Sequence, residues 1–153
     1  MGHHLLQRVA ASYDPLAAAI PGLRMVLVSG PRIDAGSLRV PDGVEVHGFL
    51  PDLDLHHAAC DVAVVQGGLS TTMELTAARR PFLYVPLEHH FEQQVHVRHR
   101  LERHRAGRAL AYADAEPGRV AEELVTLLQQ PVDYRPVPSD GAERAARLVL
   151  EAL

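Results

Sequence analysis

The sequence predicts an α/β fold in which helices cover both faces of a parallel β-sheet. Short, valine-rich apolar runs alternate along the chain with longer stretches of helical periodicity. The runs are apolar throughout, which is typical of strands buried on both faces of a parallel sheet. Strand–helix alternation of this kind gives a three-layer α/β/α arrangement with right-handed crossovers. In such folds ligands bind beyond the carboxyl ends of the strands, and the unusual residues of this chain gather at those points.

Four apolar runs are predicted to form strands, and a fifth run is weaker. They are Met25–Ser29, Val44–His47, Val62–Val65, Phe82–Val85 and, as the weaker fifth, Arg108–Tyr112. Helices are predicted between them at Leu5–Ile20, Leu53–Ala59, Thr71–Arg79, Glu92–His104 and Arg119–Gln129. Pro15 must kink or split the first helix, because proline removes a backbone donor and clashes with the preceding turn.

The C-terminal part is predicted to leave the sheet. Residues 130–140 contain three prolines and are expected to form an extended connector, followed by a last helix over 141–153. Leu148, Val149 and Ala152 could form an apolar stripe on this helix, which would pack on its own sheet or dock on a partner. We expect residues 1–153 to form a single domain with the connector and helix at its end.

Composition limits the classes of function. With 153 residues, of which 47% are hydrophobic, the chain has the size of one domain or of one half of a two-domain enzyme. A net charge of −4 argues against a protein that binds nucleic acid through its overall charge. No apolar run reaches the ~18–20 residues that span a bilayer, and no signal peptide opens the chain, so we expect a cytoplasmic protein. All 15 basic residues are arginine, as in GC-rich bacterial genomes, so the arginines between 98 and 108 are interpreted as a solvated helix face.

The sharpest functional signal is the turn after the third strand. Gly67 and Gly68 let the backbone turn tightly and approach a ligand with no Cβ in the way. The following helix presents free N–H groups and the positive end of its dipole, which suit a diphosphate. Ser70 and Thr71 add hydroxyl donors. Since many α/β joins carry such a turn without a ligand, the motif alone is a weak indication.

Glu74 has two interpretations. Thr71-Thr72-Met73-Glu74 fits a capping box, in which the glutamate accepts a hydrogen bond from the N-cap amide. The functional interpretation is that its carboxylate accepts two hydrogen bonds from a vicinal diol such as a ribose. Taken from these residues alone, the cap is the commoner explanation.

A second polar motif, Pro86 to Gln94, follows the fourth strand. Gln93 and Gln94 each offer two donors and an acceptor, which suits recognition of sugar hydroxyls, and the alternative is an ordinary polar helix start. Ten histidines raise the question of a metal site, but no ligand at suitable spacing completes a set with His96 and His99. The single cysteine, Cys60, is expected to be a small core residue, and it excludes an internal disulfide.

Residues 44–112 resemble the C-terminal, donor-binding domain of GT-B glycosyltransferases. The likeness is greatest to the N-acetylglucosaminyltransferases that form lipid II. The segments that carry it, in order along the chain, are Gly48-Phe49-Leu50-Pro51-Asp52, Cys60–Val65, Gly67–Glu74, Arg80–Pro86 and Glu92-Gln93-Gln94. The resemblance implies a Rossmann-like domain that forms half of a GT-B fold and binds a UDP-sugar.

The resemblance also implies roles for single residues. The backbone around Phe49 would meet the uracil edge, and Glu74 would take the ribose hydroxyls. Gly67, Gly68, Ser70 and Thr71 would hold the diphosphate, and the sugar would be bound by His90, Gln93 and Gln94. Because amides and a helix dipole neutralise the phosphates, no metal or other cofactor is expected. The reaction would transfer the sugar to an acceptor hydroxyl with UDP as leaving group.

Three departures from the family pattern affect these expectations. Gln66 stands where relatives usually have arginine or histidine. The acceptor domain, which normally supplies the catalytic base, is absent, and so is the first, central strand of the domain. We therefore expect a truncated piece or a separately encoded half, inactive without an acceptor domain or partner subunit. A peripheral membrane association through that partner stays open.

Two alternatives to the transferase remain. The first, a fragment of a UDP-sugar 2-epimerase, shares the architecture but needs catalytic acids in the cleft. The second is a non-catalytic nucleotide-sugar-binding or assembly module that docks through its last helix.

Overall fold

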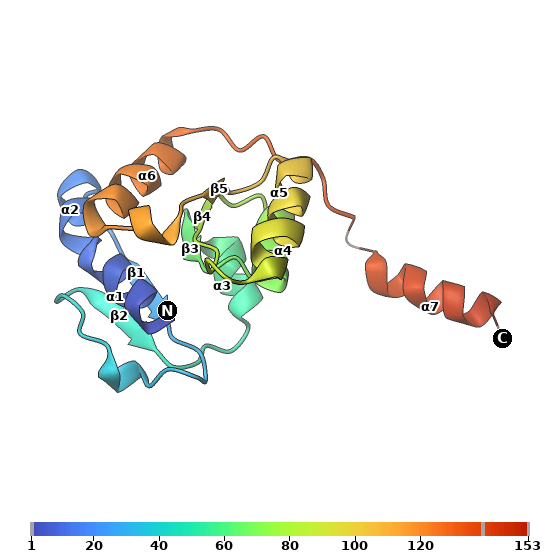
Figure 1. Cartoon of the computed structure of the whole chain (residues 1–153), viewed down its shortest axis with the longest axis horizontal. Coiled ribbons are helices and arrows are strands. Elements are labelled where there is room, and N and C mark those ends of the chain that lie inside the picture. The colour runs from blue at the N-terminus through green and yellow to red at the C-terminus, as the bar shows by residue number, and fades with distance from the viewer. Residues whose placement is uncertain (1, 139, 153) are drawn as a thin grey trace.

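The computed structural model describes residues 2–138 and 140–152 of the chain (Figure 1). Its α-helices are α1 (Gly2–Ala11), α2 (Tyr13–Ala19), α3 (Leu53–Ala59), α4 (Leu69–Ala77), α5 (Arg98–His104), α6 (Pro117–Gln129) and α7 (Gly141–Glu151). Its strands are β1 (Met25–Val28), β2 (Val44–His47), β3 (Ala63–Val65), β4 (Phe82–Tyr84) and β5 (Arg108–Ala109). Every predicted strand and helix is present, and the differences lie in where the elements begin and end.

All strand pairs are parallel, as the continuous apolar runs predict. β1 pairs with β2, with Met25 opposite Val44, and β4 lies between β3 and β5, with Val65 opposite Tyr84. The strands form two sheets instead of one, because no strand pairing joins β1 to β3 within residues 2–138 and 140–152. The two sheets are instead connected by side chains of the core.

The carboxyl ends of the two sheets meet at the start of α1. A Cβ on Gly2 would lie 3.4 Å from Cδ1 of Ile33, which follows β1, and 3.6 Å from Nε2 of Gln66, which follows β3. The segments that leave β1 and β3 are therefore neighbours at one end of the molecule. Ligands of parallel α/β folds bind at this end.

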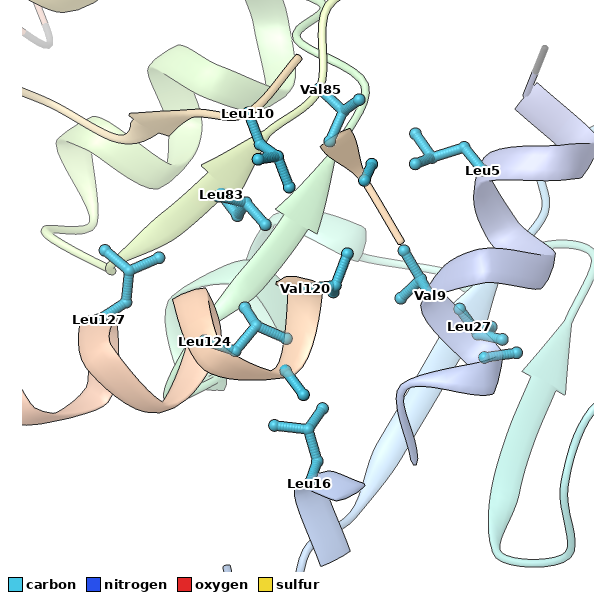
Figure 2. Packing of buried hydrophobic residues seen from close by; sticks show 13 residues of the cluster. Leu5, Val9, Leu16, Leu27, Leu83, Val85, Leu110, Val120, Leu124 and Leu127 are labelled. Carbon is cyan, nitrogen blue, oxygen red and sulfur yellow. The ribbon is translucent and has the colours of Figure 1, made fainter. Parts of the chain in front are cut away.

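The side chains of β4 alternate between two apolar clusters. Phe82 and Tyr84 pack with Leu75 of α4 and with residues of α5 and the turn before it. Leu83 and Val85 point to the other face, where Figure 2 shows residues of α1 and α6 converging on them: Leu5, Val9, Val120 and Leu124. Helices therefore cover both faces of this sheet, which confirms the three-layer prediction. Each fully buried leucine or phenylalanine contributes about 1.5–3 kcal/mol.

The first helix is split near proline, as predicted, although the break is at Ser12. Ser12 is fully buried, and its hydroxyl donates to the Val9 carbonyl at 2.6 Å. Pro15 is the third residue of α2, within the first turn. The N–H groups of a first turn have no partner inside the helix, so proline costs no hydrogen bond there.

The connector between α6 and α7 is attached to the body of the molecule. Arg79 donates to the carbonyls of Val132 and Tyr134, both at 2.9 Å, and Arg105 pairs with Asp133 at 3.1 Å. The predicted connector covered 130–140 and the predicted helix 141–153; residues 139 and 153 lie outside the described part of the chain.

The last helix, α7, stands apart from the other elements (Figure 1). None of its residues is buried, and Leu148, Val149 and Leu150 are 62–72% exposed. The predicted alternative in which this helix packs on its own sheet is therefore wrong. None of the helices in the two described ranges is long and apolar enough to cross a membrane.

Candidate functional site

The glycine turn and the polar loop after β4 lie side by side. The Val85 amide donates to the Val65 carbonyl at 2.9 Å, so the two loops leave the sheet next to each other. A Cβ on Gly67 would lie 3.6 Å from Cα of Pro86 and 3.5 Å from the ring of Tyr84. Two of the predicted motifs, far apart in sequence, therefore form one surface.

The backbone of the glycine turn suits a closely approaching ligand. Gly67 is buried and has a φ of +88°, a conformation that residues with a side chain rarely adopt. Gly68 is exposed and forms the N-cap of α4, and a Cβ placed on it would meet no atom within 4 Å. The space in front of the first turn of α4 is therefore open.

The first turn of α4 has its donors free. Among the residues that the structure describes, no side chain caps the helix, and no acidic residue lies in its first turn. The amides of Leu69, Ser70 and Thr71 therefore retain their positive potential. In the described part of the chain the hydroxyls of Ser70 and Thr71 form no hydrogen bond, which leaves them available to an anion.

Thr72, which the sequence interpretation did not assign, holds the start of this helix. It is fully buried, and its hydroxyl lies 2.9 Å from the Gly68 carbonyl oxygen and 3.0 Å from that of Leu69. The Thr72 amide also donates to the Gly68 carbonyl at 3.1 Å. These bonds direct the Gly68 carbonyl into the helix, so that the amides point toward the open space.

Glu74 does not form the predicted capping box. The N-cap is Gly68, so Thr71 lies inside the first turn and offers no N-cap amide to the glutamate. Oε2 of Glu74 instead lies 3.0 Å from Nδ1 of His57 on α3, and the glutamate side chain is 45% exposed. The capping interpretation is wrong, and the carboxylate remains open to solvent and to a ligand.

Gln93 and Gln94 hold the loop after β4 through a single residue. The Leu87 amide donates to Oε1 of Gln93 at 2.9 Å, and Nε2 of Gln94 donates to the Leu87 carbonyl at 3.0 Å. The His90 amide donates to the same carbonyl at 3.1 Å, and the His90 side chain is exposed. These bonds occupy one amide atom of each glutamine, so the residues shape the loop whether or not a sugar binds.

The two glutamines begin a helix with an unusual turn. Residues Glu92–Val97 form a π-helix before α5, where the sequence predicts one regular helix over Glu92–His104. π-Helical turns occur frequently at functional sites, because the extra residue shifts the side chains that follow. Gln93 is buried by this turn and Gln94 is half-buried.

Substitution of Gln93 by leucine is expected to loosen the loop after β4. The Leu87 amide loses its acceptor, and a hydrogen bond of ordinary strength corresponds to about a tenfold faster hydrogen exchange at that amide. Gln94→Leu is the matched control, because it removes the bond to the Leu87 carbonyl and keeps the bond to the amide. Exchange of the Leu87 amide, measured by NMR, at the same rate in Gln93→Leu and the wild type would contradict the assignment.

Phe49 and Gln66 lie at the borders of this surface. Phe49 follows β2 in the other sheet and is 77% exposed, so its side chain packs on nothing that would prevent a ligand from approaching. Gln66 is half-buried and its amide nitrogen reaches the start of α1. It brings no charge to the glycine turn.

A small basic cavity lies between the start of α4 and α5. It has a volume of about 160 Å³ and is lined by Leu69, Glu92, His96, Val97, His99, Arg100 and Arg103. Other arginines of the predicted solvated face are paired, Arg98 with Glu102 at 3.0 Å and Arg105 with Asp133. Across the two described ranges no three His, Cys, Asp or Glu side chains are placed to hold a metal ion.

Cys60 is partly buried against the second apolar cluster, as expected for a core residue. Its thiol donates to the His57 carbonyl at 3.2 Å. Burial raises the pKa of the Cys60 thiol, and the nearby Arg80 opposes that rise. A thiol in this environment is a weak nucleophile at neutral pH, so Cys60 is a structural residue.

The chain is similar to a known protein family and to individual members of it. Residues 25–150 match the profile of the glycosyltransferase family 28 C-terminal domain. The chain is 30% identical over 145 residues to a UDP-N-acetylglucosamine--N-acetylmuramyl-(pentapeptide) pyrophosphoryl-undecaprenol N-acetylglucosamine transferase of Rhodococcus opacus, with 93% of this chain and 36% of the relative covered. It is 32% identical over 129 residues to an uncharacterized glycosyltransferase of Methanosarcina acetivorans, with 84% of this chain and 32% of the relative covered.

Among solved structures, the calicheamicin glycosyltransferase CalG4 is similar, with a TM-score of 0.68 over 84% of this chain and 31% of that one. At 22% sequence identity this likeness supports the fold alone. The chain spans about a third of the length of the curated relatives it matches.

Proposed function

Because the chain belongs to the glycosyltransferase family 28 C-terminal domain family, we propose that it is the nucleotide-sugar-binding part of a glycosyltransferase. The donor is a UDP-sugar similar to UDP-N-acetylglucosamine, and the sugar is transferred to an acceptor hydroxyl. The name of the Rhodococcus opacus relative supports this donor, since it describes transfer of N-acetylglucosamine from UDP-N-acetylglucosamine.

The start of α4 is the observation that carries the proposal. Its first-turn amides lack a capping side chain, no carboxylate lies in the first turn, and Gly68 leaves the space before them open. Such a helix start binds anions because amide hydrogens and the helix dipole act together. The diphosphate of the donor binds here, to the backbone at Gly67 and Gly68 and to the hydroxyls of Ser70 and Thr71.

Glu74 is the residue that we assign to the ribose. It follows Leu69 by five residues in α4, which sets it about 7.5 Å farther along the helix axis. This separation suits a nucleoside diphosphate whose phosphates lie at the helix start. The carboxylate accepts hydrogen bonds from the 2′- and 3′-hydroxyls, and the backbone near the exposed Phe49 meets the uracil edge.

The polar loop after β4 takes the sugar. His90, Gln93 and Gln94 lie on or directly after this loop, which contacts the glycine turn at Pro86. The amide atoms of the two glutamines that do not bind Leu87 are donors and acceptors for sugar hydroxyls. The loop is thus held in shape by the same residues that contact the donor.

The chemistry assigned to this chain is stabilisation of the leaving group. Negative charge develops on the diphosphate as the bond to the sugar breaks, and the amides of α4 stabilise that charge without a metal ion. The acceptor and the base that takes its proton are bound by an acceptor domain or partner subunit. The isolated chain therefore binds donor and transfers no sugar.

Isothermal titration calorimetry with UDP, UDP-N-acetylglucosamine and ADP tests the proposal. We expect UDP and UDP-N-acetylglucosamine to bind and ADP to bind more weakly, with UDP binding unchanged by EDTA. Glu74→Ala is expected to weaken UDP binding at least tenfold, or about 1.4 kcal/mol. Glu122→Ala is a matched control, since Glu122 is an exposed carboxylate on α6. Binding of UDP at the wild-type affinity by Glu74→Ala would contradict the ribose assignment.

A second candidate function, an assembly module, is favoured by α7. Its apolar residues Leu148, Val149 and Leu150 are exposed, and the helix stands apart from the sheet (Figure 1). If the chain binds none of the three nucleotides, docking through α7 becomes the better proposal. If the chain does bind donor, deletion of residues 141–153 shows whether α7 takes part in that site, because donor binding should be unchanged when α7 only docks on a partner.

A further inference from the structure

We propose that His57 is a positioning residue for Glu74 and thereby sets the preference of the site for a ribonucleotide over a 2′-deoxyribonucleotide. This inference rests on the proposed donor site. His57 lies on α3, outside the glycine turn and the polar loop, and none of the roles above includes it. Its Nδ1 lies 3.0 Å from Oε2 of Glu74.

The burial of the two side chains differs in a way that suits this role. The His57 side chain is 13% exposed, whereas that of Glu74 is 45% exposed. The imidazole is therefore held by its surroundings, and the glutamate is the partner that would otherwise move. A glutamate on an exposed helix face samples several rotamers, and ordering it on binding costs conformational entropy. The bond to His57 removes part of that freedom before a ligand arrives.

The bond also leaves the carboxylate able to bind a diol. Each carboxylate oxygen can accept two hydrogen bonds, so Oε2 retains a lone pair and Oε1 remains as a full acceptor. An ionised carboxylate accepts hydrogen bonds from two adjacent hydroxyls at once when its plane is fixed. His57 donates through Nδ1 when the ring is charged and also when it is neutral with its proton on Nδ1, so the role does not require a charged ring.

The position of α3 connects this pair to the rest of the site. α3 begins at Leu53, directly after the loop that carries Phe49, and it packs along α4. The backbone of His57 is itself held, because the Cys60 thiol donates to its carbonyl at 3.2 Å. The His57–Glu74 pair therefore connects the loop assigned to the uracil with the helix assigned to the phosphates and the ribose.

Calorimetry with UDP and 2′-deoxy-UDP on the whole chain tests the role. The measured quantity is the ratio of the two dissociation constants, because a structural defect would weaken both nucleotides equally. We expect the wild type to prefer UDP and Glu74→Ala to lose that preference. His57→Ala is expected to weaken UDP by about fivefold, the effect of one hydrogen bond of ordinary strength, with little change for 2′-deoxy-UDP.

Two further variants control for folding and chemistry. His57→Asn keeps a short side chain with an N–H donor and is expected to restore most of the preference for UDP. His56→Ala removes the exposed neighbouring histidine and is expected to behave as the wild type. Thermal melting of each variant shows whether it folds. If His57→Ala does not fold, His57→Phe carries the test, because it keeps a ring of similar size without an N–H donor and should lose the preference for UDP.

The outcomes distinguish this inference from the proposed donor site. If the wild type prefers UDP through Glu74, and His57→Ala retains the full preference, the positioning role is wrong and the donor site stands. Equal weakening of both nucleotides by His57→Ala would also overturn the positioning role, since it indicates a structural effect. If the wild type binds no UDP, the donor site is itself wrong and the role of His57 fails with it.

Discussion

Replacing Gly68 with aspartate is expected to weaken UDP binding by about a hundredfold or more while the chain remains folded. A hundredfold loss corresponds to about 2.8 kcal/mol. Two unit charges 4 Å apart near a protein surface interact by about 4 kcal/mol, so a carboxylate at the N-cap would repel a diphosphate strongly enough. The aspartate would also accept hydrogen bonds from the first-turn amides that we assign to the phosphates.

The fold should tolerate this change. Gly68 has a φ of −67° and a ψ of 143°, which any residue adopts, and an added Cβ meets no atom within 4 Å. Aspartate is a preferred N-cap residue, so the melting temperature should stay the same or rise.

Two variants of Gly68 separate charge from shape. Gly68→Ala adds only a methyl group to the space assigned to the diphosphate, so it measures the cost of a Cβ there without a charge and should weaken UDP binding much less than aspartate does. Gly68→Asn occupies the same amides without a charge and should lie between alanine and aspartate. If aspartate binds UDP as well as alanine does, the diphosphate is not at the start of α4.

Replacing Gly107 with alanine is expected to lower the free energy of unfolding by about 3 kcal/mol. Gly107 lies between α5 and β5 with a φ of +65°, where a side chain is strained. An added Cβ would overlap the ring of Phe82, which is fully buried on β4 and has no room to move. Left-handed strain contributes about 1 kcal/mol of the cost and overpacking most of the rest.

Gly22→Ala isolates the backbone contribution. Gly22 has a φ of +76°, but no atom lies within 4 Å of an added Cβ. Its substitution should cost only about 1 kcal/mol. Urea denaturation of both variants measures the difference, and equal stabilities would show that Phe82 and its neighbours repack around the new methyl group.

The fold could be predicted from local pattern to a large extent. The continuous apolar runs predict parallel strands, and β2 has the predicted bounds, Val44–His47. The resemblance to GT-B glycosyltransferases, carried by several motifs in order, is confirmed by the family match, and the solved structure supports the fold. The π-helix at Glu92–Val97 could not be predicted, because one extra residue in a turn hardly changes the hydrophobic period.

The division into two sheets also could not be predicted. Strand pairing depends on backbone hydrogen bonds between distant segments, and no local pattern states which strands are neighbours. β1 and β3 both have the apolar sequence of a buried strand, yet they are not paired with each other.

The residues of the candidate site were easier to find than their contacts. Gly67, Gly68 and the two glutamines stand out because they follow buried strands. The spacing from Thr71 to Glu74 predicts a capping box, but the N-cap of α4 is Gly68, three residues before Thr71. His57 gave no signal, since its partner is 17 positions away on another helix.

The division of the strands means that the two sides of the proposed nucleotide site are spaced by packing rather than by a continuous ladder. Phe49 follows the β1–β2 pair, and Gly67 follows the other sheet. In the parts of the chain that are described, the join runs through buried side chains such as Val9, Leu27 and Leu83. Removal of a methylene group from one of these side chains would change the distance between the surfaces assigned to the uracil and to the diphosphate. The affinity for the ligand would then depend on residues that do not contact it.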